Sequence, residues 1–203
     1  MKLIIASRNI HKIREIRAML KNSPKWDLFS LIDFPDYEPP EETGTTFIEN
    51  SELKALHAAR TLGAWAIADD SGLVVPALDQ APGVRSARYA GERATDKENR
   101  KKLLKEMEHL QEDDRAAYYE CAMSVASPEG IEKSVSARCE GSITSTERGS
   151  QGFGYDSLFM KHDYSKTFAE LEEEMKNRVS HRRKALDKIL LFLENRALVH
   201  EDQ

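Results

Sequence analysis

The sequence predicts a protein of the α/β class, in which buried strands alternate with amphipathic helices. Short apolar runs at Lys2–Ala6 and Trp65–Ala68 have the length and composition of buried strands. Between them, Ile13, Ile16 and Leu20 recur at the spacing of one helical face. Strands alternating with helices of this kind are typical of α/β folds.

Length, charge and cysteine content limit the possible classes of function. The chain has 203 residues, which suits one domain, or one domain with two lobes, spanning 1–203. A formal net charge of −5 argues against a broad nucleic-acid surface, and no apolar run is long enough to cross a membrane. The apolar start is too short for a signal peptide, and Cys121 and Cys139 lack metal-binding spacing. We therefore expect a cytoplasmic protein that binds neither a nucleic-acid polymer nor a membrane.

The turn after the first strand has the features of an anion site. Residues 7–12 read Ser-Arg-Asn-Ile-His-Lys, and Asn9 is a suitable N-cap for the helix that follows. A helix N-terminus offers free N–H groups and the positive end of the helix dipole to an anion. An ordinary charged surface loop is the alternative. We favour phosphate binding because the turn follows the end of a strand.

A second helix is indicated by a capping box at Thr46 and Glu49, and it should continue to about Leu62. Within this helix, Asn50 and Lys54 are four residues apart and share a face. A lysine in such a position is ordinarily solvated, so the sequence alone assigns it no function.

Two adjacent carboxylates follow the apolar run in residues 66–72, which read Ala-Ile-Ala-Asp-Asp-Ser-Gly. This pattern predicts a short buried strand that ends at Asp69 and Asp70, with Gly72 allowing a turn or a close approach. Two carboxylates at a strand end suit a hard cation such as Mg²⁺, which often binds together with a phosphate. A plain strand-terminating turn is the competing interpretation.

The remaining elements follow from apolar patterns and turn residues. Glycine-rich residues 149–156 carry aromatic side chains and predict a flexible loop that could close on a planar ligand, such as a base. The other expected elements are strands at Trp26–Ile32, Ala116–Ala126, Ile131–Cys139 and Ser157–Met160, helices at Thr95–Leu110 and Thr167–Met175, a helical turn at Leu73–Leu78, and loops at 33–44 and 81–91.

A basic cluster precedes a final amphipathic helix. Basic side chains at a helix start oppose the dipole, so an anionic partner explains them better than helix stability does. An imidazole and a guanidinium held there could also donate hydrogen bonds to a polar ring edge. The cluster comprises Lys176, Arg178, His181, Arg182, Arg183 and Lys184.

Seven motifs, each weak alone, occur together between residues 7 and 186. They are Ser7–Lys12, Glu41–Gly44, Thr46–Asn50, Ala68–Leu73, Pro82–Gly91, Gly152–Asp156, and Ser180–Arg182 with Lys184–Leu186. With this set, in this order, the chain resembles the inosine triphosphate pyrophosphatase family.

The resemblance implies a hydrolase that splits inosine, deoxyinosine and xanthosine triphosphates (ITP, dITP and XTP) into the monophosphate and pyrophosphate. It implies a requirement for Mg²⁺ and a homodimer. It also implies an elongated two-lobed α/β fold around a long mixed β-sheet with flanking helices, with the active site in the cleft between the lobes.

The resemblance further implies individual roles. Glu41 and Asp70 would bind Mg²⁺, and Asp70 would also activate water; whether Glu42 or Asp69 contributes is left open. His181 and Arg182 would donate to a 6-oxo purine and disfavour adenine, which presents an amino group there. The implied substrate contacts are Ser7, Arg8, Asn9, Ile10, His11 and Lys12 to the triphosphate, Lys54 and Ser71 to the nucleotide, Phe153, Gly154, Tyr155 and Asp156 around base and sugar, and Lys176, His181 and Arg182 on the purine.

The chain departs from the family pattern at Arg8, Pro76 and Ser157, where a small residue, an acidic residue and a proline are usual. None of these departures removes a proposed catalytic group, although Arg8 could alter phosphate contacts. Two alternatives remain: a Maf-like pyrophosphatase of modified pyrimidine nucleotides, and a non-catalytic nucleotide-binding module. The stretch Ser180–Arg182 favours the purine enzyme over the first, and Asp70 argues against the second.

Overall fold

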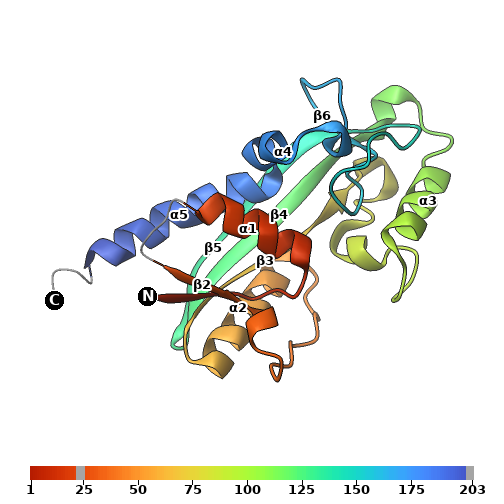
Figure 1. The fold of residues 1–203 in the computed structure, drawn as a ribbon. Coiled ribbons are helices and arrows are strands. Elements are labelled where there is room, and N and C mark those ends of the chain that lie inside the picture. Colours follow the sequence, from red (N-terminus) through yellow and green to blue (C-terminus); the bar gives the residue numbers. More distant parts are fainter. Residues whose placement is uncertain (22–25, 200–203) are drawn as a thin grey trace. The chain divides into compact units, whose positions relative to one another are not determined.

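The structure is a computed structural model that describes residues 1–21 and 26–199, without the side chains of residues 113 and 195–199. Figure 1 shows its helices and strands in chain order. The strands are β1 (Lys2–Ile5), β2 (Asp27–Ser30), β3 (Trp65–Val74), β4 (Ala116–Ser127), β5 (Gly130–Ile143) and β6 (Phe159–Lys161). The α-helices are α1 (Ile10–Leu20), α2 (Phe47–Leu62), α3 (Asp96–Glu106), α4 (Glu173–Val179) and α5 (His181–Val199).

The six strands form one mixed sheet in the order β2-β1-β3-β4-β5-β6. Strand β1 pairs in parallel with both β2 and β3, and Ile5 lies opposite Ile67. Strands β5 and β6 are antiparallel. A mixed sheet with flanking helices confirms the predicted α/β class.

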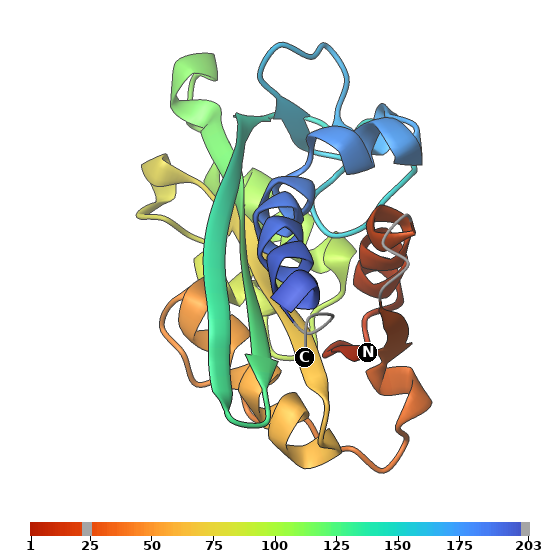
Figure 2. The same cartoon turned by 90° about the vertical axis from the view of Figure 1, so that its left-hand side faces the viewer.

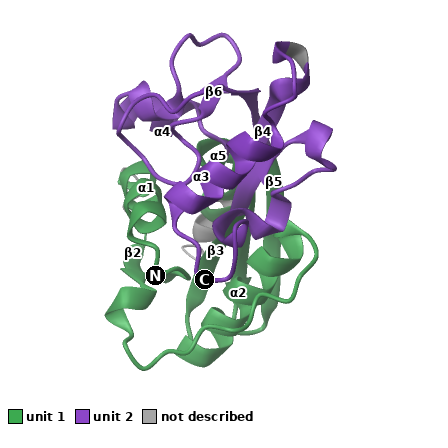
Figure 3. Ribbon diagram, turned by 90° about the vertical axis from the view of Figure 1, so that its right-hand side faces the viewer, with its two compact units in different colours: residues 1–70, 121–137, 182–203 green, residues 71–120, 138–181 purple. Residues whose placement is uncertain are grey.

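The chain divides into two compact units, which Figure 3 distinguishes by colour. Unit 1 comprises Met1–Asp70, Cys121–Ala137 and Arg182–Gln203, and unit 2 comprises Ser71–Glu120 and Arg138–His181. Strands β3, β4 and β5 therefore contribute residues to both units. The boundary in β3 falls directly after Asp70.

The core of unit 1 has two layers, because alternate residues of a strand face opposite sides of the sheet. Leu3 and Ile5 of β1 belong to a cluster with the apolar faces of α1 and α5. Ile4, between them, belongs to a second cluster with the alanine-rich face of α2. Figure 2 shows α2 and α5 on opposite sides of the strands of this unit.

The core of unit 2 is rich in aromatic side chains. The ring of Tyr119 lies 4.8 Å from that of Phe159 and 6.0 Å from that of Phe168, measured between centroids. Leu103 of helix α3 and its C-cap residue Met107 belong to the same cluster. The helix thus packs its few apolar residues inward, as its pattern predicts.

Local capping signals in the sequence are confirmed. Asn9 caps α1 by accepting from the backbone N–H of His11 and Lys12. Thr46 and Glu49 form the predicted capping box of α2, which ends at Leu62 as expected.

The predicted end of the acidic strand is wrong. Strand β3 continues through Asp69 and Asp70 as far as Val74, so the carboxylates lie inside a strand. The expected helical turn is shorter, a 3-10 helix at Pro76–Leu78. Gly72 serves a close approach, because a Cβ atom there would lie 2.3 Å from the hydroxyl oxygen of Ser86.

The predicted bounds of the C-terminal helices also need correction. In place of one helix at Thr167–Met175, the chain forms a 3-10 helix at Phe168–Glu170 and then α4. Lys176 and Arg178 lie in the last turn of α4, where basic side chains suit the helix dipole. Only the basic residues from His181 onward lie at a helix start.

The predicted strand at Trp26–Ile32 narrows to β2, and a 3-10 helix occupies Leu31–Asp33. No helix in the described part of the chain combines the length and the apolar character needed to cross a membrane.

Candidate active site

The two aspartates of β3 lie on opposite faces of the strand, as period-two alternation requires. Asp69 follows the register of Ile67, which packs with α1 and α5, and Asp70 follows that of Ala68, which packs with α2. Both side chains are largely buried. Adjacent carboxylates therefore have different neighbours.

Asp69 is held by two cations. Its Oδ2 lies 3.1 Å from the Nζ of Lys12 and accepts from the guanidinium of Arg182 at 3.0 Å. Burial alone would raise the pKa of Asp69, but Lys12 and Arg182 outweigh it and hold the pKa well below its usual range. Asp69 is thus a permanently charged group.

Arg182 is the second member of this buried cluster, and it is only 1 % exposed. Its guanidinium also donates to the carboxylate of Glu15 on α1. The anions that compensate Arg182 therefore belong to the protein itself. No external anion is required to explain its position, contrary to the inference from the helix dipole.

Asp70 lies in a different setting. Its Oδ1 accepts from the Nζ of Lys54 at 2.9 Å, and its Oδ2 accepts from the amide of Asn50 at 3.2 Å. Burial raises the pKa of Asp70 above its ordinary value, and the charge of Lys54 opposes that shift only in part. A carboxylate with a raised pKa is a better proton acceptor than Asp69.

Lys54 connects Asp70 with the acidic loop, because its Nζ also lies 3.1 Å from Oε1 of Glu42. Glu42 is half-buried, whereas Glu41 is exposed. The structure thus brings Glu42, rather than the predicted Glu41, to the same cation as Asp70. Asn50 supports this arrangement, since its Oδ1 accepts from the backbone N–H of Gly44 at 2.8 Å.

The carboxylates of Glu42 and Asp70 converge on one ammonium group, that of Lys54, and so lie on either side of it. Mg²⁺ is commonly bound by one or two carboxylates, with phosphate oxygens and waters completing its shell. The donor set therefore fits Mg²⁺. Among the described residues, no group of three or more acidic, histidine or cysteine side chains forms a metal site.

The turn at residues 7–12 is partly engaged with the protein. The side chain of Asn9 accepts from the first N–H groups of α1, and the Oγ of Ser7 accepts from the N–H of Asn9 at 3.1 Å. Arg8 donates to the backbone carbonyls of Pro35 and Tyr37. Ile10 and His11 are exposed, and Lys12 joins the acidic cluster through its contact with Asp69.

A second cluster of predicted residues lies within unit 2. The Nζ of Lys176 donates to Oδ2 of Asp156 at 2.7 Å, and the hydroxyl of Tyr119 donates to Oδ1 at 3.3 Å. The ring of His181 stacks on Tyr119, with centroids 4.6 Å apart. Burial, with the nearby charge of Asp156 acting in the same direction, raises the pKa of Tyr119 well above its usual value.

Most of this second cluster is buried, including Tyr155, whose hydroxyl donates to the carbonyl of Ser86. Phe153 and Gly154 are half-exposed. The Nζ of Lys176 lies 4.9 Å from the ring centre of Phe153. Phe153 is therefore a partly exposed aromatic ring of this unit that a planar base could pack against.

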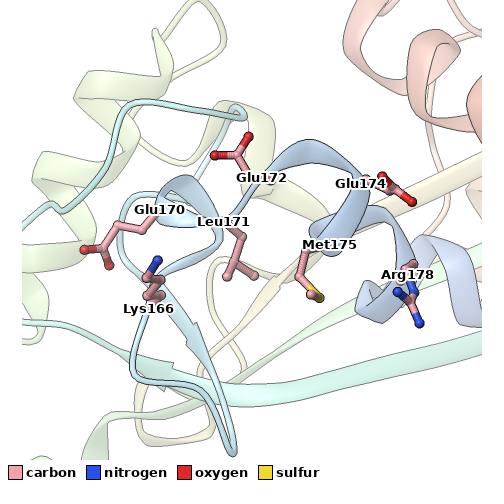
Figure 4. A pocket seen from close by; sticks show the side chains of 7 residues that line it. All are labelled: Lys166, Glu170, Leu171, Glu172, Glu174, Met175 and Arg178. Atoms are coloured by element: carbon pink, nitrogen blue, oxygen red, sulfur yellow. The ribbon is translucent and has the colours of Figure 1, made fainter.

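A surface pocket of unit 2 lies over the 3-10 helix at Phe168–Glu170 and α4, as Figure 4 shows. None of the predicted site residues lines it, so it contributes nothing to the clusters described above. Its lining residues are Lys166, Glu170, Leu171, Glu172, Glu174, Met175 and Arg178.

Sequence reasoning missed Glu15 and the role of Asn50. Asn50 had a signal, because it shares a helical face with Lys54. Glu15 had only a weak one, an acid between the apolar positions Ile13 and Ile16 of α1. Ser71 follows Asp70 in β3 and is half-buried, at the start of unit 2.

Comparison with known proteins gives a consistent result. Residues 3–192 match the Ham1 family. The chain is 54% identical over 196 residues to a dITP/XTP pyrophosphatase of Protochlamydia amoebophila, covering 96% of this chain and 98% of that protein. The structure of the Staphylococcus aureus Ham1 protein is 38% identical with a TM-score of 0.85, covering 97% of this chain and all of that one. A HAM1 protein from Coxiella burnetii is 38% identical with a TM-score of 0.86, over 96% and 99% of the two chains.

Proposed function

The chain belongs to the Ham1 family, and on that premise we propose that it hydrolyses the non-canonical purine nucleotides ITP, dITP and XTP. The products would be the nucleoside monophosphate and pyrophosphate. The observation that supports this chemistry best is the arrangement of Lys54 between Glu42 and Asp70, which places two carboxylates beside one cationic group. The match of residues 3–192 to the Ham1 family confirms the family resemblance drawn from the motifs.

In the proposed reaction, water attacks the α-phosphorus and the bond from that phosphorus to the bridging oxygen of pyrophosphate breaks. Asp70 would accept the proton of the attacking water. Lys12 and Lys54 would neutralise the charge of the phosphates. Asn50 would hold the Asp70 carboxylate in orientation, since it donates to Oδ2.

We propose that Mg²⁺ is required, with Glu42 and Asp70 as its protein ligands and Glu41 as the weaker candidate. When bound, the ion would supply neutralisation of the triphosphate and polarisation of the phosphorus centre. Lys54 would then pair with phosphate oxygens as well as with carboxylates. The remaining residues of the turn at 7–12 stay predicted contacts, with Arg8 turned toward Pro35 and Tyr37.

For the base, we propose that Phe153 packs against the ring and that Lys176 and His181 supply polar recognition. Tyr155 and Asp156 would support this unit from within, through the hydrogen bond of Tyr155 to Ser86 and that of Lys176 to Asp156. Arg182 is predicted above to read the purine. Its two protein carboxylate partners favour a different role, in which it fixes Asp69.

Product analysis tests the reaction directly. Incubation with dITP and Mg²⁺ should give deoxyinosine monophosphate and pyrophosphate, and EDTA should abolish turnover. Release of single phosphate, with the diphosphate left behind, would contradict the proposed cleavage position. ATP and a modified pyrimidine triphosphate are the comparison substrates, and both should be hydrolysed more slowly than dITP. The Asp70→Asn variant controls for a contaminating hydrolase.

We also propose a homodimer and a cytoplasmic location. Exposed apolar side chains at Phe29 and Ile32, on and beside the outermost strand β2, are compatible with an interface. Light scattering coupled to size exclusion should give twice the mass of the chain. A Phe29→Asp substitution should lower that mass if this surface is the interface.

A further inference from the structure

The loop that carries Phe153 is attached to helix α3 through both backbone groups of one glycine. The N–H of Gly154 donates to Oδ2 of Asp96 at 2.7 Å, and the carbonyl of Gly154 accepts from Nη1 of Arg100 at 2.9 Å. Asp96 and Arg100 are one helical turn apart, so they present both groups from the same face of α3. We call Asp96, Arg100 and Gly154 the α3 clamp.

Further contacts hold the side chain of Arg100, the arginine of the α3 clamp. The Nε of Arg100 lies 3.0 Å from Oε2 of Glu147, and the hydroxyl of Ser157 donates to the same oxygen at 3.2 Å. Arg100 is only 17% exposed, although Glu147 is 41% exposed. Glu147 and Ser157 lie on either side of the loop in sequence, and their hydrogen bond therefore connects its two ends beside Arg100.

The other side of Phe153 is held independently. Its backbone N–H donates to Oδ2 of Asp156 at 3.0 Å, the oxygen that also accepts from Lys176. Gly154 has a φ of 60°, a left-handed conformation that favours glycine and turns the chain here. Phe153 thus lies between the Asp156 bond and the α3 clamp, so its backbone is fixed before any ligand binds.

This geometry differs from the flexible loop expected from the glycine content. A loop that is ordered in advance avoids an entropy cost when a ligand packs against it. The benefit applies to the part of the ligand that contacts Phe153, which under the proposed function is the base. The proposed function assigns the contacts to the triphosphate to Lys12 and Lys54, which lie outside this loop.

We propose that Asp96 and Arg100 are positioning residues that determine base affinity by holding Gly154 and, through it, Phe153. The identity of the ligand in this proposal rests on the proposed function. The ordering of the loop does not rest on it, because that ordering follows from the hydrogen bonds of the loop. Neither residue needs to touch the nucleotide. Helix α3 acts on the base through the backbone of the loop alone.

Two substitutions remove the clamp, and two matched ones preserve it. Asp96→Ala and Arg100→Ala each delete one of the hydrogen bonds to Gly154. Asp96→Asn keeps a side-chain oxygen as acceptor, and Lys101→Ala removes an exposed basic side chain from the same helix. The controls separate loss of the clamp from loss of helix charge.

We expect each clamp variant to raise KM for dITP about tenfold, the scale of one hydrogen bond that involves a charged group, with kcat changed less than threefold. The inhibition constant of inorganic tripolyphosphate, which lacks a base, should stay at the wild-type value. In the clamp variants, the backbone amide hydrogens of residues 150–157 should exchange faster than in the wild type. Asp96→Asn and Lys101→Ala should resemble wild type in all three measurements.

An equal rise in KM for dITP and in the tripolyphosphate constant would overturn the proposal, because general damage to the site would produce it. Unchanged exchange at residues 150–157 in the clamp variants would also overturn it. If the wild type does not hydrolyse dITP, the proposed function fails. The clamp is then judged from exchange and from calorimetric binding of deoxyinosine monophosphate, which the variants should weaken about tenfold relative to wild type.

Discussion

Replacing Arg182 with alanine gives the most direct test of the buried charge cluster. The side chain is fully buried and pairs with both Asp69 and Glu15. Its removal takes this cation from both carboxylates and leaves Asp69 paired with Lys12. Breaking a buried ion pair in this way costs on the order of 3–5 kcal/mol of unfolding free energy.

The neighbouring Arg183 supplies a matched control. Its partner Asp187 is one turn away on the same helix, and both side chains are substantially exposed. An exposed pair of this kind contributes about 0.3–0.5 kcal/mol. Arg182→Ala should therefore lower the melting temperature by roughly 10 °C or more, while Arg183→Ala changes it by only about 1–2 °C.

The assay is thermal and urea unfolding followed by circular dichroism, with the wild type and both variants under identical conditions. Adding Glu15→Gln to Arg182→Ala should restore part of the lost stability, because it removes one of the uncompensated carboxylates. Equal losses for the two arginine variants would refute the assignment of Arg182 to a buried ion pair.

The same variant distinguishes the two roles of Arg182. If Arg182 fixes Asp69, kcat/KM should fall by a similar factor for ITP and ATP, and their ratio should stay close to the wild-type value. If Arg182 reads the 6-oxo group, the ratio should fall by about tenfold or more, as a lost charged hydrogen bond implies. Glu15→Gln serves as the comparison, since it perturbs the arginine without removing it.

Three further predictions follow from single residues. Asp70→Asn should lower kcat by about a hundredfold or more while the circular dichroism spectrum is retained, and near-normal turnover would exclude Asp70 as the base. Burial raises the pKa of the Cys121 thiol to about 12, so neither it nor buried Cys139 should react with iodoacetamide at pH 8 until denaturant is added; rapid labelling of the native protein would contradict this. Gly72→Ala should destabilise the fold by about 1–3 kcal/mol in urea unfolding, because its Cβ would meet Ser86, and an unchanged midpoint would show that the segment relaxes.

Signals confined to one stretch of chain were predictable from the sequence. The caps at Asn9 and Thr46 depend on contacts within four residues, and both are confirmed. The buried face of α1 follows from helical spacing alone. The class of the fold, which needs only the type and order of such elements, is confirmed for the same reason.

The composition of the site could be predicted only in part, because its partners are distant in sequence. Arg182 and Glu15 are 167 residues apart, and no local pattern connects them. Distinguishing Asp69 from Asp70 requires knowing which helices cover each face of β3. Similarly, the choice between Glu41 and Glu42 depends on the reach of Lys54, which the spacing within α2 does not reveal.

The alternation of Asp69 and Asp70 along β3 has a consequence for how the gene can vary. Side chains in a strand change face with every residue, so a one-residue insertion or deletion before Asp69 would exchange the two carboxylates between the α1 side and the α2 side. A deletion would place Asp70 at the former position of Asp69, and an insertion would place Asp69 at the former position of Asp70, although no functional residue had been lost. The site should therefore tolerate many substitutions in residues 65–68 better than the insertion or deletion of one residue there. The in-frame deletion of one codon in this segment should be as damaging as the removal of Asp70.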